Sequence, residues 1–133
     1  MAGGKLSGKA TETVEFLDYV LRQCDHLAVN VEEYASARKS TQADWARQSI
    51  ARELGHLRQR AMVRNLGVLA DEIGRLAVQA GGGGSPQMRT RILRDGVVSL
   101  KAACARMRRA TVEADKGDQA ERAEAKAPTS EGE

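Results

Sequence analysis

The sequence predicts an all-α protein, an antiparallel four-helix bundle with disordered N- and C-terminal tails. Apolar residues recur at helical spacing through the middle of the 133-residue chain. Aromatic residues make up only 3% of it and there are two prolines, a composition that disfavours β-sandwiches and barrels. The core must therefore be aliphatic, and a chain of this length supports one such core.

The first ten residues form a Gly-, Ser- and Lys-rich arm that we expect to be disordered. The first two helices are expected to follow this arm. Thr11 or Thr13 is the expected N-cap of the first helix, and Ser40 or Thr41 that of the second. The predicted core stripe of the first helix is Leu17, Val20, Leu21, Cys24, Leu27, Ala28, Val31 and Ala35. That of the second is Ala43, Ala46, Ile50, Leu54, Leu57 and Ala61.

The last two helices are separated from the rest by glycine-containing segments. Asn65-Leu66-Gly67 predicts a break, although one long helix would also tolerate a single glycine. The third stripe is Val68, Leu69, Ile73, Leu76, Ala77 and Ala80, and Gly81 to Pro86 ends that helix. The fourth stripe is Ile92, Leu93, Val97, Leu100, Cys104, Met107 and Ala110. The bundle is thus expected over 11–112, with an acidic, largely disordered tail over 113–133 into which the fourth helix could extend for a turn or two.

Charge is segregated along the chain, whose formal net charge is +3. Residues 11–37 hold six acids and one base, a net charge of −5, whereas residues 86–112 hold seven bases and one acid, a net charge of +6. Two interpretations follow. The acidic first helix can lie beside the basic fourth helix, or the fourth helix can bind the phosphate backbone of a nucleic acid.

The sequence offers little support for catalysis or for a cofactor. Glu53 and His56 form one Glu-x-x-His pair, but the second pair of a di-iron bundle is missing, so we expect neither metal nor cofactor, and no enzyme. Cys24 and Cys104 are expected to be reduced core thiols. No signal peptide or apolar run long enough for a bilayer is visible, so we expect a cytoplasmic protein without membrane contact.

The outer face of the second helix is the predicted protein-binding surface. At 100° per residue, five side chains point away from the core stripe: Trp45, Arg52, His56, Gln59 and Val63. Tryptophan and arginine dominate the energetics of many interfaces, so this face predicts a protein partner. Trp45 could instead pack beneath a neighbouring loop or the N-terminal arm. A second copy of the chain could also use this face, which leaves a homo-oligomer open.

The basic fourth helix is the alternative binding surface. Arg94, Lys101 and Arg108 are spaced seven residues apart on one flank, and Arg91, Arg106 and Arg109 extend the positive charge around the outside. Because no aromatic side chains are interleaved for base stacking, nucleic acid would be bound through its backbone.

The segment around His56 carries a further pattern. It reads Gly55-His56-Leu57-Arg58-Gln59-Arg60-Ala61-Met62-Val63-Arg64-Asn65-Leu66-Gly67. This resembles the histidine phosphotransfer (HPt) domain, a four-helix bundle in which an exposed histidine carries a phosphoryl group between signalling proteins. The resemblance implies that His56 is the phosphoacceptor. The family has Lys and Gly at the third and fourth positions after the histidine, where this chain has Gln59 and Arg60, so it also fits a phosphotransfer-deficient relative.

Together these features predict a non-catalytic cytoplasmic adaptor or signalling module, HPt-like, that binds a protein through the outer face of its second helix. The alternative is a small accessory nucleic-acid-binding protein that uses its fourth helix.

Overall fold

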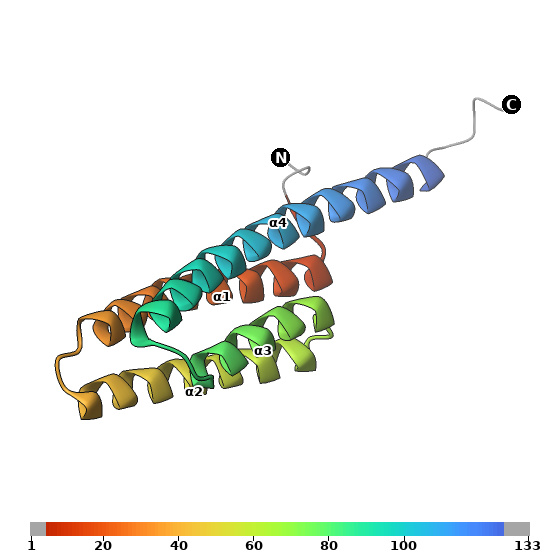
Figure 1. The fold of residues 1–133 in the computed structure, drawn as a ribbon. Helices are drawn as coiled ribbons and strands as arrows, with labels where there is room; N and C mark the ends of the chain where they lie inside the picture. The colour runs from red at the N-terminus through yellow and green to blue at the C-terminus, as the bar shows by residue number, and fades with distance from the viewer. Residues whose placement is uncertain (1–4, 127–133) are drawn as a thin grey trace, which may run out of the picture.

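The computed structural model describes residues 5–126, which form four helices joined by short loops (Figure 1). The helices are α1 (Gly8–Ser36), α2 (Ser40–Val63), α3 (Gly67–Gly81) and α4 (Pro86–Lys126). Each helix packs against its neighbours in the sequence, and α4 closes the bundle by packing on α1. The predicted antiparallel four-helix bundle is confirmed. Within residues 5–126, no helix combines the length and apolar character needed to cross a bilayer.

The core is a narrow seam of aliphatic side chains with a spacing of three and four residues. On α1 the buried positions include Leu17, Val20, Cys24, Leu27 and Val31, and the predicted α2 stripe is buried from Ala46 to Ala61. Phe16 and Tyr34 are also buried, which the sequence analysis did not predict. The prediction was wrong for Ala28, Ala35, Val68 and Ala110, which are exposed, and for Ile92, which is 36% exposed. Most of these follow or precede a buried residue by one position, and a rotation of about 100° carries them off a narrow seam.

The ends of α1 and α4 differ from the predicted boundaries at residues 10 and 112. Helix α1 begins earlier, at Gly8, because the Ser7 hydroxyl caps it by accepting a hydrogen bond from the Ala10 N–H at 3.2 Å, so neither predicted threonine is the cap. Helix α4 continues through residues 113–126, which are therefore helical. The Ser7 N–H donates to Asp115 at 3.0 Å, so the two extensions support each other. The remainder of both predicted tails, 1–4 and 127–133, lies outside the described residues.

The connections between helices follow the glycine and asparagine positions. Asn65 has a φ of 61°, in the left-handed region that asparagine tolerates, and this turn separates α2 from α3 as predicted. Residues 82–85 connect α3 to α4, and the Ser85 hydroxyl accepts from the Met88 N–H at 3.1 Å. The N-cap of α2 is Lys39, which makes no side-chain capping bond, so the predicted cap at Ser40 or Thr41 is wrong.

Candidate functional site

The five residues of the predicted protein-binding surface lie together on the exposed side of α2. Trp45 is 64% exposed and Val63 is 71% exposed, and the three polar residues between them are exposed as well. Trp45 lines a depression together with Glu33 and Ser36, near the end of α1. The five side chains recur at intervals of seven, four, three and four residues, which keeps them on one helical face.

Trp45, Arg52 and His56 of this face line a groove between α1 and α2, here called the α1–α2 groove, whereas Gln59 and Val63 line none of its depressions. Three depressions of about 270, 310 and 300 Å³ follow one another along it. The first holds Trp45, the second holds Arg52 and His56, and the third is shared by Arg60 and Arg64. The opposite wall comes from α1 and includes Glu33, Gln23, Tyr19, Phe16, Glu15 and Glu12. Sequence reasoning missed this wall because helical phase does not reveal which helices are neighbours.

Arginines of α2 cover aromatic rings of α1 at one end of the groove. The Arg60 guanidinium carbon lies 5.2 Å from the centroid of the Tyr19 ring, and Arg64 extends over Phe16 at 4.6 Å. The centroids of the two rings are 6.1 Å apart. A cation over an aromatic face is attracted by the quadrupole of the ring. These contacts hold positive charge at this end of the groove and link α1 to α2.

His56 lies beside a partly buried carboxyl group. Burial raises the pKa of Glu53, while the nearby His26 and His56 and a hydrogen bond from Asn30 act in the opposite direction. The Asn30 amide donates to Glu53 Oε1 at 3.3 Å. Within the described part of the chain, no three His, Cys, Asp or Glu side chains gather where they could hold a metal ion.

The basic stripe of α4 is paired with acidic side chains of α1. Three contacts form a series, here called the α1–α4 ladder: Arg94–Glu32 at 2.6 Å, Lys101–Asp25 at 2.8 Å and Arg108–Asp18 at 2.7 Å. Both helices contribute a residue every seven positions, which matches two antiparallel helices with a heptad seam. The first interpretation of the charge pattern, an acidic helix beside a basic one, is confirmed.

Three of the six cations predicted to bind nucleic acid are paired in the ladder. Arg91, Arg106 and Arg109 are exposed and make no ion pair with residues 5–126. The other three predicted cations already have carboxylate partners on α1. The free positive charge of α4 is therefore smaller than its sequence indicates.

Comparisons with protein-family models, curated proteins and solved structures found no match for this chain.

Proposed function

We propose that this protein is a non-catalytic binding module, an adaptor or signalling component, that recognises a protein partner along the α1–α2 groove. The observation that supports this most directly is the exposed Trp45, on the same face as the exposed Val63. Burial of an aromatic anchor and of flanking apolar side chains is a main source of affinity in protein interfaces.

The charge of the groove indicates what kind of segment it would bind. Arg52, Arg60 and Arg64 line its central and far depressions, and no ion pair within the described residues engages them. Glu33 lies at the Trp45 end. Glu12 and Glu15 share the far depression with Arg60 and Arg64, so the excess positive charge lies in the central depression, where Arg52 and Arg60 accompany the single carboxylate of Glu53. A partner segment with one apolar anchor for the Trp45 end and an acidic residue for the central depression would complement this arrangement.

Matched valine variants test the proposal. Val63 is 71% exposed beside the groove, on the outer face of α2, and Val78 is 75% exposed on α3, so Val63→Ala and Val78→Ala truncate the same side chain on two different surfaces. The tagged protein and both variants, together with Trp45→Ala, would be used to capture partners with and without nuclease. We expect a protein partner to be captured equally with and without nuclease. The amount captured should fall with Trp45→Ala and with Val63→Ala, and should be unchanged with Val78→Ala. Capture that depends on intact nucleic acid would instead favour the outer arginines of α4.

A narrower form of the proposal concerns His56 as a phosphoacceptor. Its side chain is exposed, as phosphotransfer requires, and Arg52 and Arg60 line the same depression, where they would offset the charge of a phosphoryl group. His26, the second histidine of the chain, provides the matched control. Incubation with acetyl phosphate should add one phosphoryl group to the wild type and to His26→Gln, but none to His56→Gln. If no protein is labelled, the groove is a binding surface without phosphotransfer.

A further inference from the structure

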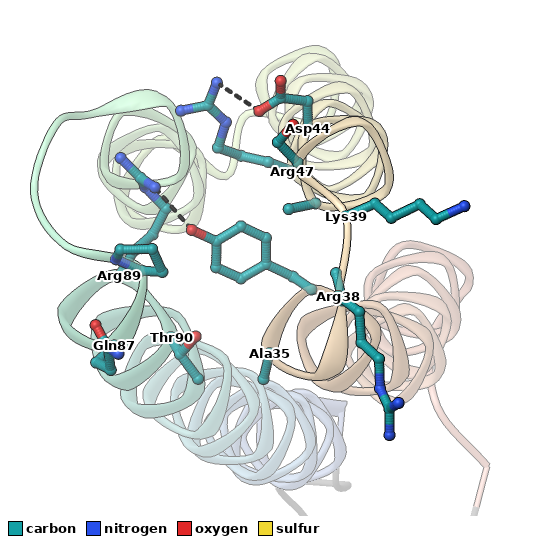
Figure 2. A pocket seen from close by; sticks show the side chains of 13 residues that line it. Ala35, Arg38, Lys39, Asp44, Arg47, Gln87, Arg89 and Thr90 are labelled. Atoms are coloured by element: carbon teal, nitrogen blue, oxygen red, sulfur yellow. Dashed lines mark hydrogen bonds and ion pairs between the residues drawn. The ribbon is translucent and has the colours of Figure 1, made fainter.

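A second concave site lies at the end of the bundle where α1 passes into α2 and where α4 begins (Figure 2). It has a volume of about 390 Å³ and is here called the end pocket. Tyr34 of α1, Arg47 of α2 and Arg89 of α4 line it, together with Arg38 and Lys39 of the connecting segment. It shares no lining residue with the three depressions of the α1–α2 groove.

The end pocket carries excess positive charge. Its lining holds four cationic side chains and one carboxylate, that of Asp44, a formal net charge of +3. Asp44 lies 3.7 Å from the Arg47 guanidinium, a long separation for an ion pair, and its side chain is 63% exposed. Figure 2 shows the Arg38 and Lys39 side chains pointing away from Arg89, so they contribute charge at the rim of the pocket.

Arg89 is a partly buried charge without a counter-ion among residues 5–126. Its Nη1 donates to the Tyr34 hydroxyl at 2.7 Å and its Nη2 donates to the Gly82 carbonyl, and both of these acceptors are neutral. Its Nε is buried and has no hydrogen-bond partner in the described structure. A buried cation is stabilised by an opposite charge, which neutral oxygens do not provide. The charge of Arg89 is therefore not balanced by a carboxylate of the described residues.

Two further groups are suited to hold an anion there. The Tyr34 hydroxyl accepts its bond from Arg89, so its own proton is free to be donated. Ser40 is the first residue of α2. The first backbone hydrogen bond of that helix runs from the Ala43 N–H to the Lys39 carbonyl, so the N–H of Ser40 lies before it and has no acceptor within the helix. Both Lys39 and Ser40 line the pocket. The positive end of the helix dipole thus adds to the charge of the side chains.

We propose that the end pocket binds a small phosphate monoester, with the phosphoryl group held between Arg47, Arg89 and the Tyr34 hydroxyl. The donors come from three different helices, which suits the tetrahedrally arranged oxygens of a phosphoryl group better than the two coplanar oxygens of a carboxylate. A dianion would offset two of the three excess positive charges of the lining. The volume exceeds that of a phosphoryl group and leaves room for a small organic part.

Titration of the full chain with inorganic phosphate and with glycerol 3-phosphate, at constant ionic strength, tests this proposal. Backbone amide resonances report the position of binding. We expect saturable shifts at Ser40 and at Arg89 with one ligand per chain, and a higher affinity for the monoester than for inorganic phosphate. Acetate should bind far more weakly than either. Non-saturating shifts, or acetate that binds as tightly as phosphate, would overturn the proposal.

Charge-neutralising variants distinguish specific binding in the end pocket from non-specific attraction of phosphate to a positively charged protein. Arg47→Gln leaves the Arg89–Tyr34 bond in place, and we expect it to weaken phosphate binding about 10-fold or more, because it removes a charged hydrogen bond. Arg91→Gln removes the same charge from the exposed side of α4, outside the lining, and should leave the affinity unchanged. Equal weakening in the two variants would show that net charge alone attracts phosphate and would refute a built site.

Discussion

Arg94 on α4 binds both carboxylate oxygens of Glu32 on α1, with Nε 2.7 Å from Oε2 and Nη2 2.6 Å from Oε1. This bidentate contact lowers the pKa of Glu32 and raises that of Arg94. It is the first member of the α1–α4 ladder, in which every contact joins an acid of α1 to a base of α4. The segregated charges of the sequence thus favour one neighbour and one antiparallel register for each of these helices.

Reversing the charges of one ion pair of the ladder should show whether its two residues stabilise the fold through each other. Arg94→Glu places two carboxylates opposite each other, and we expect a small decrease in the free energy of unfolding, since exposed pairs are worth little individually. Adding Glu32→Arg should restore most of that loss. Urea unfolding at low salt measures both, and Arg91→Glu, which has no partner among residues 5–126, provides the control. A double variant no more stable than Arg94→Glu would contradict the pairing.

The partly buried carboxyl of Glu53 should make stability depend on pH in a defined direction. Burial raises the pKa of Glu53 in the folded state, so folding favours the neutral carboxyl group. The stability that this preference contributes is fully present below the unfolded pKa of about 4.5. It is lost as the pH rises through the folded pKa. Glu53→Gln removes the charge and keeps a carbonyl oxygen for Asn30. We expect this variant to be more stable than the wild type at pH 7, by less than about 1 kcal/mol because solvent screens the group. The difference should disappear below about pH 4, where Glu53 itself is neutral. A variant less stable at pH 7 would show that the carboxylate is needed.

The two thiols should be inert in the folded protein. Burial raises the pKa of Cys24 to about 12 and that of Cys104 to about 11, and both side chains are 0% exposed. Since the thiolate is the reactive form, alkylation by iodoacetamide at pH 8 should require unfolding. We expect negligible labelling in buffer and labelling of both cysteines in denaturant, as measured by mass spectrometry. Rapid labelling in buffer would indicate that the seam between α1 and α4 opens readily.

Two glycines inside helices should respond to alanine in opposite directions. A Cβ on Gly96 would overlap Cδ1 of the buried Leu76 and lie 3.3 Å from its Cγ, so α3 and α4 approach closely there. We expect Gly96→Ala to destabilise the bundle by about 1–2 kcal/mol, because overpacking outweighs the gain in helix propensity. A Cβ on Gly55 of α2 would have nothing within 4 Å, and Gly55→Ala should stabilise by about 0.5–1 kcal/mol. Thermal unfolding compares the two, and stabilisation by both would show that Leu76 repacks freely.

The helices and most of the core could be predicted from the sequence because both depend on local spacing. Leu54 and Leu57 are buried as the apolar period requires, and Asn65 marks the turn by its tolerance of positive φ. The start of α1 could not be predicted in this way. It depends on Ser7 and on its hydrogen bond to Asp115, which is 108 residues away.

The candidate site was predictable only in part, for the same reason. Helical phase predicted that Trp45 and His56 share an exposed face, but it does not show which helix lies beside that face. The end pocket depends on contact between Tyr34 and Arg89, which are 55 residues apart, and neither residue stands out in its own segment. Aromatic residues at seam positions, such as Tyr34, are the one signal that could have indicated it.

The α1–α4 ladder also bears on the order in which the chain can assemble. Its contacts join residues 62, 76 and 90 positions apart, whereas α2 and α3 are separated by a single three-residue turn. During synthesis α1 emerges first and its partner α4 emerges last, so the apolar seam of α1 facing α4 stays uncovered until the final helix has been made. The α2–α3 hairpin can form early at a small entropic cost, and closure by α4 completes the bundle.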